Sequence, residues 1–118
     1  MINIDKAKKA FDKYVEKYDV SNDRIKLKID HIKRTAECSK NIAKSLKLAD
    51  DDVKLAELIG LLHDIGRFEQ LRVYNTFLDK DSINHGEYGV KILFQDGKIR
   101  DFIDDNQYDE IIKKVVLE

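Results

Sequence analysis

Three histidines and one aspartate are the side chains of this sequence best suited to chemistry. The histidines are His31, His63 and His85, and Asp64 follows His63 directly. Imidazole and carboxylate together suit a divalent ion of the borderline kind, such as manganese, iron, zinc, cobalt or nickel. A buried imidazole and carboxylate also need polar partners, because burying them alone is costly. A metal site is therefore one interpretation of this pattern.

The doublet of His63 and Asp64 closes an apolar stretch, "AELIGLLHDIG", at residues 56–66. Neighbouring positions on a helix differ in direction by about 100°, so these two side chains cannot lie parallel. They converge on one ion only if it sits against the end of the helix. A second helix must then bring another ligand, and His31 is the candidate.

Each of these signals also has a structural explanation. A single histidine on an apolar helix face is more often a hydrogen-bonded core residue than a ligand, and the dipeptide His-Asp is common by chance. Composition and spacing alone leave both interpretations open. Three histidines on inward faces, one of them joined to an aspartate near a glycine, favour the metal site.

The apolar periodicity predicts an all-α fold whose helices must position these residues. His31 is expected on a buried flank of the second helix, in a row with Leu27, Cys38 and Ile42, and Cys38 is expected to be a small core residue. Gly66 is expected to end the third helix in the left-handed conformation. Helices are predicted at about 4–18, 23–48, 50–66, 85–94 and 107–118, with a short helix or turn at 68–73.

Composition limits the class of protein. With 118 residues, 42% hydrophobic and 38% charged, the sequence predicts one globular domain over residues 1–118. Proline is absent and glycine numbers only 5, which favours helices. The net charge of −1 argues against a nucleic acid polymer as partner. The single Cys38 excludes an internal disulfide and a cysteine-based zinc site.

The segments that carry the candidate residues resemble a known family. "HIKRTAECSKNIAKSL" (31–46) and "LAELIGLLHDIGRFEQ" (55–70) resemble the HD-domain superfamily of metal-dependent phosphohydrolases. That family has an all-helical fold and the pattern His, His-Asp and a final Asp. His31 matches the first histidine, and His63 and Asp64 match the doublet. "INHGEYGVKIL" (83–93) resembles the segment in which a further histidine, here His85, approaches a second metal or the substrate.

The sequence departs from the family at several points. No downstream aspartate stands out as the final ligand, so we expect the bundle to be truncated at its C-terminal end, before the helix that carries it. Arg67 stands where nucleotidases and alarmone hydrolases of the superfamily have a glutamate, which argues against those activities. The Gly-Tyr-Pro signature of the cyclic-dinucleotide branch is missing because the chain has no proline. The downstream aspartates lie in polar stretches: Asp96, Asp101, Asp104, Asp105 and Asp109.

The resemblance implies a phosphohydrolase that cleaves a phosphomonoester or a nucleotide-type ester with metal-activated water. It implies His31, His63 and Asp64 as metal ligands, with the ion open among Mn, Fe, Zn, Ni, Co and Mg. Asp64 could also accept the proton of the water, and His85 would bind a second ion or protonate the leaving oxygen. Arg67 would bind the phosphate, although an arginine at a helix end is also favoured by the helix dipole alone.

An inactive regulatory or ligand-binding domain with the same fold is the alternative to an enzyme. The expected partner is a small phosphorylated molecule, and the oligomeric state is left open. No apolar stretch approaches the length of about 18 residues that a transmembrane helix needs, and no signal peptide is seen, so no membrane partner and a cytoplasmic location are expected.

Overall fold

The computed structural model describes residues 2–118, and within this range every regular element is helical. The prediction of an all-α, HD-like bundle is confirmed, with a Cα radius of gyration of 13.9 Å. None of the described helices combines the length and apolar character required to cross a membrane. The elements are α1 (Ile4–Val15), α2 (Asp23–Ser45), α3 (Asp50–Leu62), α4 (Gly66–Tyr74), a 3₁₀ turn η1 (Asp79–Asp81), α5 (His85–Val90), a π-helical segment η2 (Lys91–Gln95), α6 (Ile99–Phe102) and α7 (Asp109–Leu117).

Asparagine caps begin three of the helices. The side chains of Asn3, Asn22 and Asn84 accept hydrogen bonds from backbone amides in the first turns of α1, α2 and α5. Three aspartates fill the first turn of α3, where the helix dipole favours negative charge. Both α1 and α2 end three residues before their predicted ends. Local side chains therefore fix where the helices begin more sharply than where they end.

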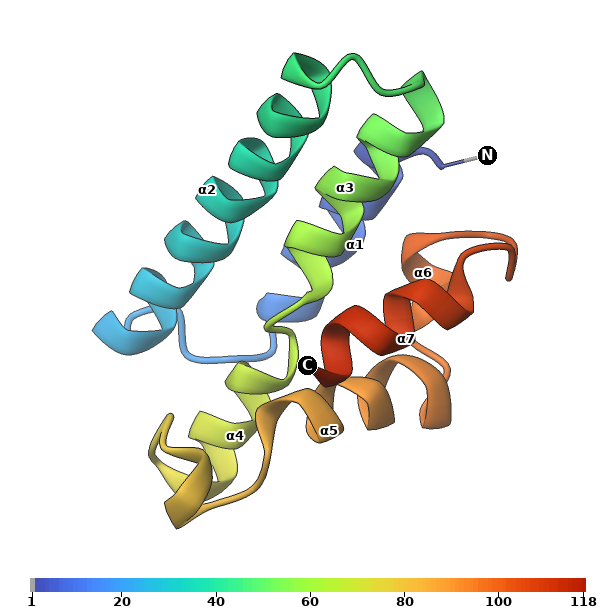
Figure 1. The fold of residues 1–118 in the computed structure, drawn as a ribbon. Coiled ribbons are helices and arrows are strands. Elements are labelled where there is room, and N and C mark those ends of the chain that lie inside the picture. Colours follow the sequence, from blue (N-terminus) through green and yellow to red (C-terminus); the bar gives the residue numbers. More distant parts are fainter. Residues whose placement is uncertain (1) are drawn as a thin grey trace.

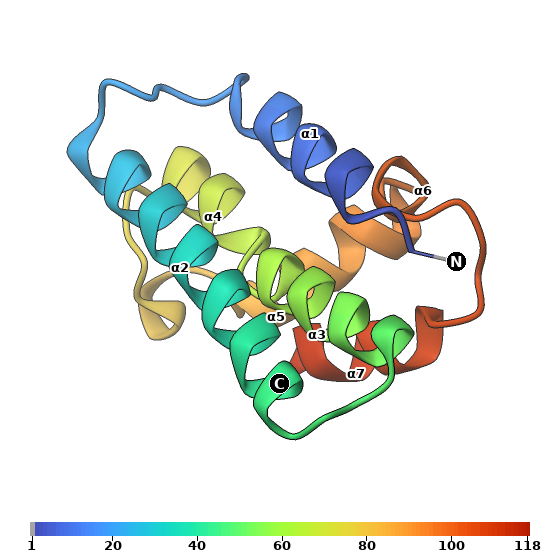
Figure 2. The ribbon, with the colours of Figure 1, turned by 90° about the horizontal axis from the view of Figure 1, so that it is seen from above.

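Helix α3 is the centre of the bundle, because α1, α2 and α7 all pack on it (Figure 1, Figure 2). Helix α2 approaches α3 most closely at Gly60, where an added Cβ would lie 2.7 Å from the Cα of Ala36. Aromatic side chains fill the space between α1 and α4: Phe11 meets Phe68 edge-on with ring centroids 6.1 Å apart. The first contact fixes the C-terminal part of α3 against α2, and the second fixes α4 against α1.

Helix α7 returns to pack against α5 (Figure 1). An added Cβ at Gly86 would lie 2.5 Å from the carbonyl oxygen of Leu117, so only glycine permits this approach. Between the two helices the chain turns at Gly97, whose φ of 78° lies in the left-handed region that glycine adopts freely. The end of α7 thus lies beside the first turn of α5, where His85 is found.

Candidate functional site

The His-Asp doublet lies at the corner between α3 and α4. His63 caps the C-terminus of α3, and α4 begins at Gly66, only two residues after Asp64. The prediction that Gly66 is a left-handed helix end is wrong, since its φ is not positive. Glycine is needed there for a close approach: an added Cβ would lie 2.3 Å from the carbonyl oxygen of His85. This contact brings the start of α5 to the doublet.

The carboxylate of Asp64 is the centre of the site. His63 and His85 place their Nε2 atoms 3.4 Å from its Oδ2 and Oδ1 respectively, and His31 places Nε2 4.0 Å from Oδ2. The ammonium of Lys28 is 3.5 Å from Oδ2. Three parts of the chain therefore meet at one carboxylate that is only 12% exposed: α2, the α3–α4 corner and α5.

His31 joins this group from the surface and not from the core. Its side chain is 52% exposed, so the prediction of a buried flank is wrong. The neighbours expected on that flank, Leu27, Cys38 and Ile42, are exposed as well. Helix α2 packs through Ile25, Ile32, Ala36 and Ala43 instead, and this leaves the ring of His31 at the rim of the site.

Three of these residues have the geometry of a metal-ligand group. One ligand atom each from His31, His63 and Asp64 lies within 4.8 Å of the others. Within residues 2–118 no further carboxylate joins this group. Several of the downstream aspartates pair elsewhere: Asp96 with Lys91, Asp104 with Lys6 and Asp109 with Arg100.

Hydrogen bonds fix the orientation of two of the imidazoles. The Nδ1 of His63 lies 2.6 Å from the carbonyl oxygen of Gly60, and the Nδ1 of His85 lies 2.8 Å from Oδ2 of Asp79. Both acceptors require a proton on Nδ1, so Nε2, the ring atom nearer Asp64, is the atom that each ring could offer to an ion after losing its own proton. Such an outer hydrogen bond is typical of histidines that bind metals.

Electrostatics keep the carboxylate of Asp64 ionised. Burial alone would raise its pKa, but the hydrogen bond with His63 and the charges of His63, Lys28 and His85 lower it well below the usual range. Burial likewise would lower the pKa of His63, and its hydrogen bond with Asp64 raises it overall. The site is therefore an anionic centre surrounded by groups that carry or accept a positive charge.

The HD-domain family model matches residues 29–118, which is most of the sequence. The chain belongs to the HD-domain family. No curated protein and no solved structure matches the chain. Membership in the HD-domain family implies the superfamily of metal-dependent phosphohydrolases, whose members bind divalent metals. The matched range includes Asp64 and the three histidines that contact its carboxylate: His31, His63 and His85.

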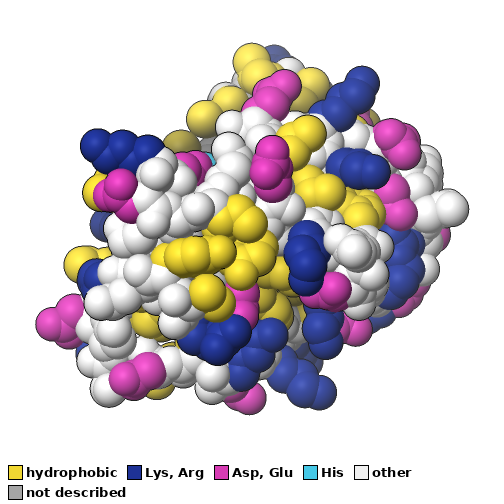
Figure 3. Space-filling view, turned by 90° about the horizontal axis from the view of Figure 1, so that it is seen from below, with side chains coloured by type: hydrophobic (Ala, Val, Ile, Leu, Met, Phe, Trp, Pro, Cys, Tyr) yellow, Lys and Arg dark blue, Asp and Glu magenta, His cyan; other side chains and the backbone are white. Residues whose placement is uncertain are grey.

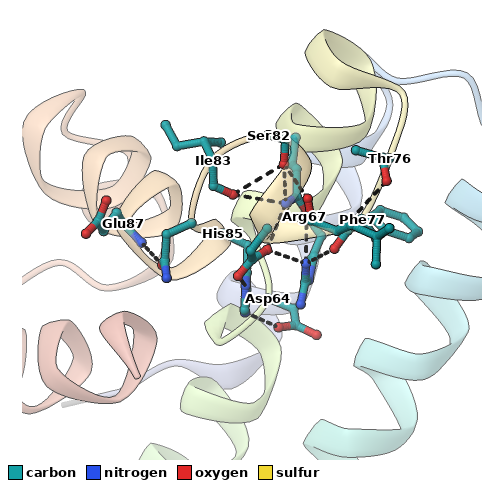
Figure 4. A network of polar contacts seen from close by, with 12 residues as sticks. Asp64, Arg67, Thr76, Phe77, Ser82, Ile83, His85 and Glu87 are labelled. Atoms are coloured by element: carbon teal, nitrogen blue, oxygen red, sulfur yellow. Dashed lines mark hydrogen bonds and ion pairs between the residues drawn. The ribbon is translucent and has the colours of Figure 1, made fainter.

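A polar network behind the doublet of this HD domain was missed by the sequence analysis (Figure 4). Its centre is Asp79 in η1, which accepts hydrogen bonds from His85, Arg67 and Gln70 at 2.8–2.9 Å. Gln70 is fully buried and also donates to the hydroxyl of Ser82. No periodic pattern marks Asp79, and its position six residues before His85 in a polar loop was the only available signal.

Arg67 lies in this network and does not reach the metal-ligand group. Its Nη1 donates to the side chains of Gln70 and Asp79 and to the carbonyl oxygen of Phe77, at 2.6–2.9 Å, and its Nε is buried without a hydrogen-bond partner. Among the described residues, the cation that does reach Asp64 is Lys28, which also lies 5.3 Å from the ring centroid of Phe77. No pattern in the sequence distinguishes Lys28 from the other lysines of α2.

Proposed function

We propose that this HD domain hydrolyses a phosphate ester, with a divalent ion held by His31, His63 and Asp64. The observation that carries the proposal is the convergence of three imidazole Nε2 atoms on the buried carboxylate of Asp64. Hydrophobic packing does not require a buried carboxylate that three imidazoles contact. Membership in the HD-domain family supports the reaction class.

The donor set fits a borderline divalent ion. Two imidazoles and one carboxylate are ligands that Mn, Fe, Co, Ni and Zn all accept, and Mg is also a candidate in this family. The outer hydrogen bond from His63 to Gly60 holds one ring ready to bind through Nε2. When bound, a divalent ion supplies Lewis-acid chemistry: it lowers the pKa of water toward neutrality and offsets phosphoryl charge.

His85 is proposed as the residue next to the leaving group. Its ring is held between Asp79 on one side and Asp64 on the other, which fixes the direction of Nε2. From this position the Nε2 proton can pass to the leaving oxygen of the ester, and Asp79 then keeps the neutral ring in one orientation. Holding a second ion is the other role open to His85.

An open pocket of about 420 Å³ beside His31 supports an anionic substrate. Its lining combines the cations Arg24, Lys28 and Arg34 with the apolar side chains of Leu27 and Phe77, and none of its lining side chains is acidic. A phosphate group there would meet cations, and an organic group would meet Leu27 and Phe77. Lys28 is the proposed contact for the phosphoryl group because it already reaches Asp64.

Phosphate binding by Arg67 stays a prediction. The hydrogen bonds of Nη1 support a different role, in which Arg67 holds the 77–79 segment and, through Asp79, the ring of His85. We propose Arg67 as a positioning residue.

A regulatory HD domain without turnover is the second candidate. One observation favours it: the metal-ligand group within residues 2–118 has three members, and a weak or absent ion would leave a domain that only binds its ligand. The two candidates differ in whether a metal is retained and an ester is cleaved.

The first test is bound metal, measured by elemental mass spectrometry on protein purified without a metal-affinity tag. We expect near-stoichiometric manganese, iron, zinc, nickel or cobalt in the wild type and its loss in His63→Ala and Asp64→Ala. Asp81→Asn is the matched control, since Asp81 is an exposed carboxylate two residues from Asp79. Metal retained in both site variants would refute the assignment of the ligands.

Cleavage is tested separately with p-nitrophenyl phosphate and bis(p-nitrophenyl) phosphate, each with Mn, Fe(II), Zn, Ni, Co or Mg added. Turnover that disappears in Asp64→Ala and persists in Asp81→Asn would support the enzyme. Metal binding without cleavage of either ester would favour the regulatory domain.

A further inference from the structure

A strongly basic groove lies between α1 and α6, away from the His-Asp site. It has a volume of about 560 Å³ and shares no lining residue with the His-Asp site. Six cations and one carboxylate, Asp101, line it. The whole chain, by contrast, has a net charge of −1. The cations are Lys6, Lys9, Lys13, Lys17, Lys98 and Arg100.

The cations come from two elements that face each other across the groove. Those of α1 and the turn after it are three or four residues apart, so they follow one face of the helix. Lys98 and Arg100 reach the groove from the start of α6, which packs against α1. In Figure 3, which views the molecule from below, Lys and Arg side chains gather at the lower centre and right of the face, beside apolar surface.

Most of this charge is not neutralised by the protein. Lys6 pairs with Asp104 and Arg100 pairs with Asp109. Within residues 2–118, Lys9, Lys13 and Lys98 form no ion pair, and Lys17 lies over the ring of Tyr14 at 4.3 Å from its centroid. Like charges this close repel one another unless an anion lies between them.

We propose that this groove binds a soluble small molecule that carries several phosphate groups. Four ammonium groups along α1 and the turn after it, with Lys98 and Arg100 on the α6 side, match an anion that carries several charges, and a volume of about 560 Å³ is typical of small-molecule sites. Ala10, Tyr14 and Phe102 give the groove an apolar floor for the organic part of the ligand. The net charge of −1 does not favour a nucleic acid polymer as the ligand.

The test is calorimetric titration of the metal-free protein with sodium tripolyphosphate, in a chelating buffer that removes binding through an ion at the His-Asp site. The groove variant is Lys9→Gln/Lys13→Gln/Lys98→Gln. The control variant, Lys26→Gln/Lys44→Gln/Lys114→Gln, removes the same charge from three exposed lysines that do not line the groove. Thermal unfolding of both variants checks that the fold is retained.

We expect the groove variant to bind tripolyphosphate at least about tenfold more weakly than the wild type, and the control to stay within about twofold. Lys98→Gln alone should also weaken binding, because the ligand is held from both walls. Equal affinity in the groove and control variants, or no binding by the wild type, would overturn the proposal. So would an unchanged affinity in Lys98→Gln, which would place the anion on α1 alone.

Two further arms separate the possible sources of phosphate. Phosphatidylserine vesicles and a single-stranded oligonucleotide are offered to the same proteins at the same ionic strength. If the protein binds tripolyphosphate but neither the vesicles nor the oligonucleotide, the result supports a soluble ligand. Retention of vesicles or oligonucleotide through the groove lysines, with no binding of tripolyphosphate, would refute it.

Discussion

At the scale of single residues, Asp64 decides the character of the site. It is the one carboxylate that Lys28 and three imidazoles share, and burial makes every one of those interactions stronger than it would be in water. Removing the carboxylate would leave Lys28 and the three imidazoles without the group that they share. A divalent ion placed among the same groups would gain a charged ligand that is already ionised.

Metal addition should therefore stabilise the fold through Asp64 and His63. At a metal concentration about 100 times the dissociation constant, the free energy of unfolding rises by about 2.7 kcal/mol. We expect nickel or manganese to raise the thermal midpoint of the wild type, measured by differential scanning fluorimetry, and a chelator to reverse the rise. An equal rise in Asp64→Asn or His63→Ala would show that the ion binds elsewhere.

Asp79 should be a positioning residue that holds Arg67 and His85, which lie outside its own loop. Asp79→Asn removes charge-assisted hydrogen bonds to Arg67 and His85 and is expected to cost about 1–2 kcal/mol of unfolding free energy in urea. In a turnover assay it should lower kcat by roughly tenfold or more while the metal content is retained. If Asp79→Asn were as stable and as active as Asp81→Asn, the network would have no such role.

At the scale of elements, glycines let helix backbones approach where the site is assembled. Gly60 brings α3 onto α2, which carries His31, and Gly66 brings the start of α4 onto α5, which carries His85. In each case the nearest atom to an added Cβ belongs to backbone, which cannot move aside as a flexible side chain does. The positions of the histidines thus depend on small residues one helix away.

Gly60→Ala should destabilise the protein although alanine is the better helix former. Alanine at a free helix position gains about 1 kcal/mol over glycine. Here the added Cβ would lie 2.7 Å from the Cα of Ala36, so we expect a net loss of about 2 kcal/mol or more in urea unfolding. A variant more stable than the wild type would mean that α2 and α3 can separate without cost.

Glu69 should link the end of α1 to α4 in a pH-dependent way. Its hydrogen bond with Arg72 lowers the pKa of Glu69, against the effect of burial and with help from Tyr18, whose hydroxyl lies 2.7 Å away. A lowered folded-state pKa means that the stabilisation is complete above the usual value of 4.5 and is lost as the pH falls through the folded-state value. Glu69→Gln should therefore be less stable than the wild type at pH 7.

The stability difference between Glu69→Gln and the wild type should shrink in acid, as the pH falls below 4.5. Urea unfolding at a series of pH values measures it. Glu16→Gln, an exposed glutamate next to the end of α1, is the control and should show no such trend. A constant difference at all pH values would show that the loss comes from packing alone.

The helices and the His-Asp doublet could be predicted because their signals are local. Apolar periodicity marked the main helices, and the doublet stood out by residue type. The exposure of His31 could not be predicted, since Leu27 and Ile42 gave α2 a second apolar row that no other helix covers. Asp79 and the true role of Gly66 depend on contacts between segments distant in sequence, which no local pattern encodes.

At the scale of the whole molecule, a single core joins α1, α2, α3, α4, η2, α6 and α7. The long-range contacts link the first helix to α6 and the central helix to the last one. Because these elements share one core, none of them can be removed without exposing apolar surface of another. The chain is expected to behave as one cooperative unit.

Urea unfolding should accordingly show one transition over residues 1–118. Far-UV circular dichroism follows the helices, and near-UV circular dichroism follows the 5 tyrosines, which lie in α1, α4, α5 and the turns that follow α1 and precede α7. The two signals should give the same midpoint, with a slope of about 1–3 kcal/mol per molar urea. Midpoints that differ would indicate two separately folding parts.

The exposure of Cys38 has a practical consequence. It is the single thiol of the chain, and it lies on α2 seven residues after His31, which corresponds to about 10 Å along the helix axis. A fluorescent dye attached there would be close enough for a coloured ion such as nickel, cobalt or copper at His31 to quench its emission by energy transfer. The chain thus carries a unique position for an optical reporter of ion occupancy that needs no substrate.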